Sequence, residues 1–154
     1  MGRKRVARGD FDVGKLMGID FGDVRTGVAT SDPMGLIATG AGCIKSTNLR
    51  RTAEMAAEMA KEKGVDTIVV GHPINMNGTL GPRSERVQAF AGILRELTDL
   101  PVILHDERLS TAQAHQMLNL TGSYGKKRRE VIDEMSACLI LQNYMDQQKN
   151  KQNG

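Results

Sequence analysis

The stretch LMGIDFGDVRTGVATS, residues 16–31, decides how the rest of the chain is organised. Two short apolar runs, at 16–19 and 28–29, are separated by Gly, Asp and Arg residues, which predicts a β-hairpin. The first run is apolar on both faces, which favours a strand in the middle of a sheet. Asp20 follows this run directly. We therefore expect a carboxylate at the rim of a buried sheet, where it needs a cation or hydrogen-bond donors. The simpler interpretation is a turn aspartate that caps backbone amides.

Composition narrows the class of protein. A chain of 154 residues is long enough to bury a core and suggests one domain. An aromatic content of 3% disfavours an aromatic platform for stacked bases. The net charge of +3 and pI of about 9.0 favour anionic partners. Cys43 and Cys138 lack metal-ligand spacing, so we expect free thiols in a reducing compartment. Neither a membrane span nor the apolar core of a signal peptide is found, and we expect a cytoplasmic protein.

The ends of the chain differ in composition from the middle. We expect one domain at 15–146, between a basic tail at 1–14 and a polar tail at 147–154. The basic tail either contacts phosphates or merely increases solubility.

The middle of the chain alternates strand and helix patterns. A turn signal at 32–35 precedes a strand at 36–39, which should extend the hairpin into an antiparallel meander. Residues 48–63 favour a helix, and Gly64 is suited to end it. The β-branched run at 66–71 is typical of a buried strand. A strand that follows a helix in this way implies a parallel βαβ unit.

The second half continues the alternation. We expect a helix from Pro82 to about Thr98, a strand at 101–105, a helix at 110–120 and a last helix at 132–144. The predicted fold class is therefore α/β. It is a mixed five-stranded sheet, with three antiparallel strands followed by two parallel ones, flanked by helices.

Two basic segments are candidates for phosphate binding. Arg83 and Arg86 lie in the first turns of the helix that follows the long loop at 71–83. Free amides and guanidinium groups there predict a phosphate cradle, although an ordinary connecting loop is the alternative. His72, in the same loop, is either a ligand or base or a structural residue. The loop at 122–130 contains four consecutive cations, which fits a nucleic-acid backbone or a solvated loop. Those four cations are Lys126, Lys127, Arg128 and Arg129.

Three acids are candidates for metal binding. Asp20 and Glu107 each follow a buried strand, at the edge where open α/β sheets bind ligands. Asp133 lies in the first turn of the last helix. There it either is stabilised by the helix dipole or points toward the other two acids. Crowded carboxylates repel unless a cation joins them, and oxygen ligands suit Mg²⁺ or Mn²⁺. Two such ions can activate a water and stabilise the leaving oxygen in phosphodiester hydrolysis. Arg108 would brace Glu107 or contact a phosphate.

Four motifs together resemble the YqgF/RuvX family of RNase H-like nucleases. They occur in order over residues 16–146 and read GIDFGDVRTGVATSDPMGLI, IVVGHPINMNGTLGPR, LPVILHDERLSTAQA and KKRREVIDEMSACLILQNYMD. The resemblance implies an RNase H-like fold. It also implies that Asp20, Glu107 and Asp133 are the catalytic, metal-binding acids. His72 and Asn77 depart from the family pattern, where Leu and Asp are expected, and neither is one of the three acids.

The resemblance implies a metal-dependent nuclease that processes the 5′ end of pre-16S rRNA. Its partners would be precursor rRNA or structured DNA, together with a ribosomal particle, and it would act as a monomer or a homodimer. A Holliday junction resolvase is the first alternative, and symmetric cutting of a junction would require a dimer. A non-catalytic nucleic-acid-binding module is the second. A nucleotide-binding protein of the actin and sugar-kinase type is the third, but such proteins need two domains of this kind.

Overall fold

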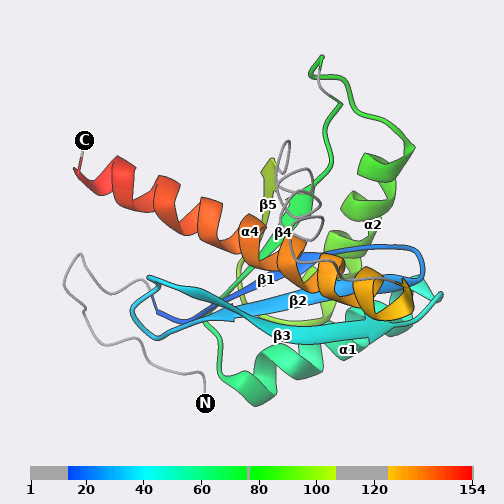
Figure 1. Cartoon of the computed structure of the whole chain (residues 1–154), viewed down its shortest axis with the longest axis horizontal. Helices are drawn as coiled ribbons and strands as arrows, with labels where there is room; N and C mark the ends of the chain where they lie inside the picture. Colours follow the sequence, from blue (N-terminus) through cyan, green and yellow to red (C-terminus); the bar gives the residue numbers. More distant parts are fainter. Residues whose placement is uncertain (1–13, 76, 107–124, 154) are drawn as a thin grey trace.

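A computed structural model describes residues 14–75, 77–106 and 125–153. In the last of these segments, side chains are described for residues 129–149. Its elements in chain order are β1 (Leu16–Asp20), β2 (Arg25–Ser31), β3 (Ala38–Lys45), α1 (Leu49–Lys63), β4 (Thr67–His72), α2 (Pro82–Leu97), β5 (Val102–Asp106) and α4 (Gly125–Asn153). Figure 1 shows the sheet with α4 crossing one face.

The five strands form one mixed sheet in the order β3-β2-β1-β4-β5. β1 pairs antiparallel with β2 and parallel with β4, so Ile19 lies between Val28 and Val70. β2 also pairs antiparallel with β3, and β4 pairs parallel with β5. This arrangement confirms the predicted fold class and the central place of the first strand.

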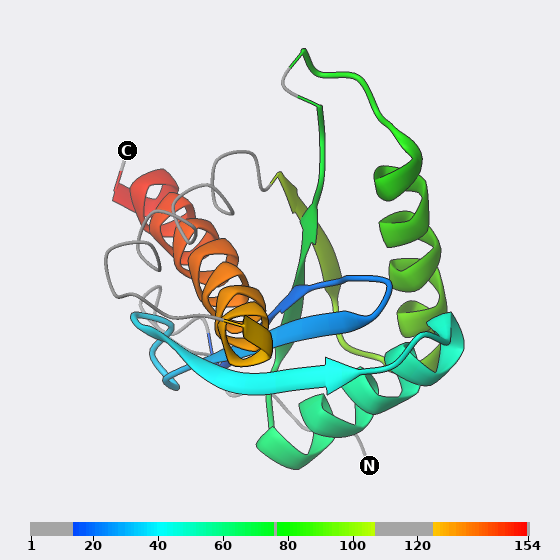
Figure 2. The same ribbon diagram turned by 45° about the vertical axis from the view of Figure 1, so that its right-hand side comes forward.

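Side chains of β1 alternate between two cores. Met17 and Ile19 are fully buried on the face that α1 and α2 cover, where Phe90 also lies. Leu16 is buried on the other face, in a separate cluster that includes Leu141 of α4. Figure 2, turned by 45°, shows α4 on one side of the sheet and α1 and α2 on the other. A strand between two covered faces reads as a continuous apolar run, which explains the sequence of β1.

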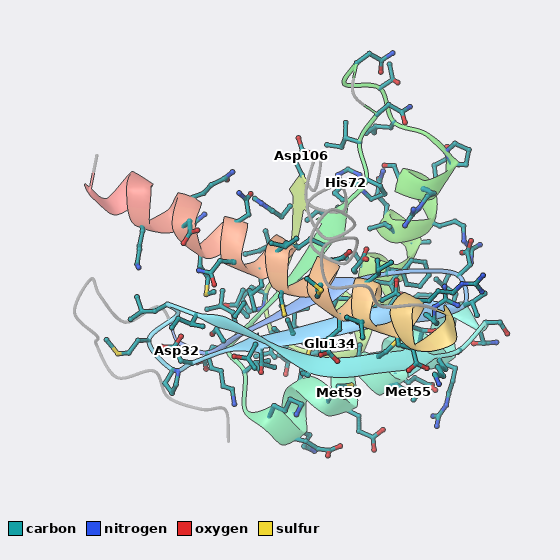
Figure 3. All side chains as sticks on the ribbon, viewed as in Figure 1. Asp32, Met55, Met59, His72, Asp106 and Glu134 are labelled. Carbon is teal, nitrogen blue, oxygen red and sulfur yellow. The ribbon has the colours of Figure 1, made fainter. Side chains whose placement is uncertain are left out.

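Glycines on three neighbouring strands let α4 lie close to the sheet. A Cβ atom at Gly18 would lie 2.7 Å from Cβ of Leu141 and 2.9 Å from the carbonyl oxygen of Ala137. A Cβ at Gly27 would overlap the main chain of Asp133, and one at Gly40 would overlap the side chain of Glu134. Figure 3 labels Glu134 where α4 crosses the sheet. Gly18 and Gly27 need glycine because the helix backbone approaches the strands directly, whereas at Gly40 only the flexible side chain of Glu134 lies close.

The ends of α1 are as the sequence predicts. The Asn48 side chain accepts a hydrogen bond from the amide of Arg51, and Gly64 ends the helix with a φ of 65°. An Asn cap and a left-handed glycine are common signals for the start and end of a helix.

Two predicted elements have the wrong boundaries. The third strand is at Ala38–Lys45 and not at 36–39, because it follows β2 along its whole length. The last helix begins at Gly125 and not at 132, so the run at 126–129 is helical and not a loop. Lys, Arg and Glu are good helix formers, and their charge does not prevent a helix. The helix also includes 147–153, which we expected to be part of a polar tail.

Some sequence predictions lie outside the described residues. They are the basic tail, the helix at 110–120, and Glu107 and Arg108. Within the described ranges, no helix has the length and apolar character needed to cross a bilayer.

Candidate nuclease site

Asp20 ends β1 on the face of the sheet that α4 covers. It pairs with Gly27 of β2 across the antiparallel ladder, and paired residues project to the same face. Gly27 faces the main chain of Asp133 in α4. The main chain of Asp133 therefore lies against the strand that pairs with Asp20.

Asp133 is held by an arginine from β2. Nε of Arg25 donates a hydrogen bond to Oδ2 of Asp133 at 2.9 Å, and the side chains are 31% and 20% exposed. Burial raises the pKa of the Asp133 carboxyl above its ordinary value, while the hydrogen bond and charge of Arg25 oppose that shift. The charge of Arg83 acts in the same direction as Arg25.

Sequence reasoning missed Arg25. The signal was its spacing, because Arg25 lies two residues before Gly27 in a strand and so projects to the same face. Nothing in the sequence pairs it with Asp133, which is 108 residues away.

A pocket of about 300 Å³ opens beside Asp133. Its lining comes from the β1–β2 turn, from β2, from α2 and from α4. The lining residues are Phe21, Gly22, Asp23, Val24, Arg25, Arg83, Arg86, Val87 and Asp133. The two arginines predicted as a phosphate cradle thus lie in one pocket with a predicted metal-binding acid.

Each arginine of α2 in this pocket contacts the β1–β2 turn. Nη2 of Arg83 donates to the carbonyl oxygen of Phe21 at 3.5 Å, and Nε of Arg86 donates to Oδ1 of Asp23 at 2.5 Å. Arg83, Arg86 and Arg25 give the pocket three guanidinium groups against the two carboxylates of Asp23 and Asp133. The excess of guanidinium groups over carboxylates favours the binding of a further anion in this pocket.

A second, smaller pocket of about 220 Å³ lies at the start of α4. It is lined by Val24, Arg25, Lys45, Arg129 and Glu130. Of the four predicted cations at 126–129, Arg129 is the one whose side chain is described.

A divalent metal would find a suitable donor set here. Asp20 and Asp133 offer carboxylate oxygens, which Mg²⁺ and Mn²⁺ prefer, and Arg25 already gives the half-buried Asp133 one cationic partner. Among the described residues, no three His, Cys, Asp or Glu side chains are grouped closely enough to hold a metal. The third predicted ligand, Glu107, follows Asp106 at the end of β5 and lies outside the described ranges.

His72 connects two elements near that strand edge. It ends β4, beside Asp106 of β5 in the parallel register. Figure 3 labels both residues at this end of the sheet. Nε2 of His72 lies 2.6 Å from Oγ of the buried Ser84 in α2. This contact favours the structural interpretation of His72 over a ligand or base.

Comparisons with known proteins show the family of this chain. A family model described as "RuvX: Holliday junction resolvase" matches residues 14–147. A relative from Geobacillus kaustophilus is 49% identical over 137 residues, which cover 88% of this chain and 99% of the relative. A relative from Ruminiclostridium cellulolyticum is 46% identical over 133 residues, covering 86% and 94%. Both are named, provisionally, as pre-16S rRNA nucleases.

Solved structures support the fold. RuvC of T. thermophilus, in complex with a Holliday junction substrate, aligns with a TM-score of 0.56 at 14% identity and covers 89% of this chain and 96% of RuvC. The fowlpox virus resolvase in complex with Holliday junction DNA gives a TM-score of 0.54 at 13% identity, covering 86% and 97%.

Proposed function

The chain belongs to the RuvX family and is a nuclease, and from this membership we propose that it is a metal-dependent enzyme that processes precursor 16S rRNA. One observation supports the proposed site above all others. Gly27 pairs with Asp20 and lies against the main chain of Asp133, which supports a site that these two acids would share. Beside them lies a pocket with three arginines.

The acids would hold the metal. Asp20 and Asp133, with Glu107, would supply carboxylate oxygens to Mg²⁺ or Mn²⁺. When bound, the metal supplies activation of water and stabilisation of the leaving oxygen in phosphodiester hydrolysis. Arg25 would orient Asp133 and favours its ionised form, against the effect of burial.

The cations would position the nucleic-acid backbone. Arg83 and Arg86 present guanidinium groups in the pocket beside Asp133, and guanidinium groups bind phosphate oxygens in bidentate geometry. The basic first turn of α4, at 126–129, lies on the adjoining side with Arg129 in the second pocket. We assign Arg108 to the same task, next to Glu107.

Precursor rRNA is the substrate that the curated relatives favour. The relatives named for this activity are 46–49% identical and are matched over nearly their whole length. We propose that the enzyme acts on an immature ribosomal particle in the cytoplasm, as a monomer or a homodimer.

Resolution of a four-way DNA junction is the second candidate function. The description of the matching family model favours it. Symmetric cutting of a junction requires two active sites related by a two-fold axis, so a resolvase should be a dimer in solution.

A cleavage assay tests the proposal. Precursor 16S rRNA, free and in immature particles, and a synthetic four-way junction would be offered with Mn²⁺ or Mg²⁺, and with EDTA as the metal-free control. We expect cleavage of the rRNA that Asp20→Asn abolishes and that Asp99→Asn, an exposed acid after α2, leaves unchanged. Cutting of the junction alone would establish the resolvase. Full activity of Asp20→Asn or activity in EDTA would refute the metal site.

A further inference from the structure

The two pockets are adjacent because they share part of their lining. Val24 and Arg25 line both the pocket beside Asp133 and the pocket at the start of α4. The β1–β2 turn therefore separates two hollows, with α2 beyond one and β3 with α4 beyond the other.

Each hollow is lined by a cation that forms an ion pair with an acid. Arg86 is paired with Asp23 on the α2 side, and Lys45 of β3 is paired with Glu130 of α4 on the other. Arg25, between them, is paired with Asp133. The cations thus follow one another across the turn, from α2 through β2 to β3.

The turn between the hollows is anchored to its neighbours. The amide of Ser46, after β3, donates to the carbonyl oxygen of Val24 at 3.0 Å. The amide of Gly22 donates to Oγ1 of the buried Thr26 at 3.3 Å. The Val24 side chain remains 53% exposed on this anchored turn. An exposed aliphatic group between two cationic hollows can pack on a sugar or a base.

We propose that a single strand of nucleic acid crosses the β1–β2 turn, with phosphates in both hollows and Val24 between them. Arg83 and Arg86 contact the backbone on the α2 side, and Lys45 and Arg129 contact it on the α4 side. The inference rests on the proposed nuclease function and deepens it, because it gives the strand a path on both sides of Asp133. The hollows are separate small concavities, which suit successive nucleotides of one strand.

The acids of these two ion pairs act as placeholders for phosphates. In the absence of nucleic acid, each acid occupies the position beside its cation that a phosphate would take. Asp23 and Arg86 are 64% and 47% exposed, and Lys45 and Glu130 are 67% and 35% exposed. Exposed ion pairs contribute little to stability, so a phosphate can displace the acid at small cost. Removing such an acid should therefore strengthen binding of the strand, and removing its cation should weaken it.

Salt dependence of binding tests the path. The full chain would be titrated with a labelled short oligouridine in EDTA, which prevents metal-dependent cleavage, over a series of salt concentrations. The slope of log K against log salt reports phosphate contacts, at about 0.7 for each contact on a single strand. We expect the double variant Lys45→Gln/Arg129→Gln to bind more weakly. Its slope should be reduced by about 1.4, because two phosphate contacts are lost. Arg86→Gln should reduce it by about 0.7.

The matched control is Arg51→Gln. Arg51 is also an exposed cation in a surface ion pair, with Glu54, but it lies in α1 on the other face of the sheet. It should change neither the slope nor the affinity. The opposite sign is expected for Glu130→Gln and Asp23→Asn, which should bind the strand more tightly than the wild type. An oligothymidine should give the same slopes, because phosphate contacts carry no sequence information.

Several results would overturn the path. In one such result, the variant of Lys45 and Arg129 has an unchanged slope while Arg86→Gln has a reduced slope. The strand would then not extend past Arg25 toward α4, and the proposed nuclease function would be unaffected. Weaker binding by Glu130→Gln would refute the placeholder role. Slope changes seen with a duplex and not with a single strand would refute the single-stranded path. Absence of binding by the wild type would overturn the path, and with it the backbone contacts of the proposed function.

Discussion

Gly27 of β2 faces the main chain of Asp133 so closely that any Cβ atom at Gly27 would overlap the carbonyl group of Asp133. Gly27 also pairs with Asp20. A residue without a side chain therefore sets how closely α4 approaches the strand that pairs with Asp20. The proposed site would depend on this contact as well as on the acids.

Gly27→Ala should damage both stability and activity. The added methyl group meets backbone atoms, which cannot move aside as a flexible side chain does. Forced shifts of this kind typically cost ~1–3 kcal/mol of the free energy of unfolding. Because the shift moves Asp133 away from Asp20, cleavage should fall even at temperatures where the variant is folded. Urea unfolding and a cleavage assay on the same preparation would measure the two effects.

Gly92→Ala is the matched control for that substitution. Gly92 lies in α2, and an added Cβ there would meet nothing within 4 Å. Alanine is favoured over glycine in a helix, so this variant should be more stable by about 0.5–1 kcal/mol. Equal destabilisation by the two substitutions would contradict the close approach of α4 at Gly27.

Much of the fold follows from local patterns in the sequence. The apolar run of β1 predicts a central strand, and Gly64 predicts the end of α1. β3 is different, because Gly40 and Gly42 interrupt any alternation of apolar and polar residues. Pairing with β2 and the cover of α4 make it a strand, and neither is visible in its own sequence.

The candidate site, like the fold, could be predicted only in part from local sequence patterns. Asp20 was proposed from its place after an apolar run. Asp133 was proposed from a place in the first turn of the last helix, which was wrong because α4 begins at Gly125. The partner of Asp133 was not identifiable, because Arg25 meets it only when α4 lies across β2. The basic run at 126–129 was recognised as a charge cluster, but its helical backbone depends on residues further along α4 that pack on the sheet.

Asp32→Ala should make stability depend on pH differently from the wild type. Asp32, labelled in Figure 3, accepts hydrogen bonds from the amides of Met34, Leu36 and Ile37. Hydrogen bonds from those backbone amides hold the pKa of the Asp32 carboxyl below its usual value of 3.8. The folded state therefore binds this proton less readily than the unfolded state. The resulting stability is present above pH 3.8 and is lost as pH falls through the lower, folded-state pKa.

The wild type should exceed Asp32→Ala in unfolding free energy by about 1 kcal/mol at neutral pH. The difference should shrink below pH 3.8. Urea unfolding over a series of pH values would measure it. Asp99→Ala is the control and should stay within about 0.5 kcal/mol of the wild type. Cleavage should not change, because Asp32 follows the end of β2 opposite Arg25. A difference that grows on acidification would contradict the sign.

His72→Leu should retain cleavage activity. His72 contacts Ser84, and Gln88 also donates to Oγ of Ser84 at 3.0 Å. Loss of the histidine therefore leaves the buried hydroxyl one partner, at a cost of about 1 kcal/mol in stability. The same substitution in a Ser84→Ala background should cost less, because the shared contact is already gone. Loss of cleavage with unchanged stability would instead make His72 part of the catalytic site.

Arg25→Gln should slow cleavage through Asp133. Nε of Arg25 donates a hydrogen bond to Oδ2 of Asp133 at 2.9 Å, and burial raises the pKa of that carboxyl although Arg25 opposes the shift. Loss of a residue that orients a metal-binding carboxylate typically costs 10–100-fold in activity or metal affinity. We expect a fall of about that size in kcat at saturating substrate, with more Mn²⁺ needed for half-maximal rate. Arg25→Lys should recover part of the loss, because it keeps the charge without the fixed geometry of the guanidinium.

Calorimetric titration with Mn²⁺ alone separates this role from an effect on substrate. If Arg25 orients Asp133, Arg25→Gln should bind Mn²⁺ more weakly than the wild type, and Arg25→Lys should be intermediate. If Arg25 instead competes with the metal for Oδ2 of Asp133, the order reverses and Arg25→Gln binds Mn²⁺ more tightly. The second result would make the ion pair an inhibitory contact of the metal-free protein. It would refute the orienting role and leave the acids and the pocket as described.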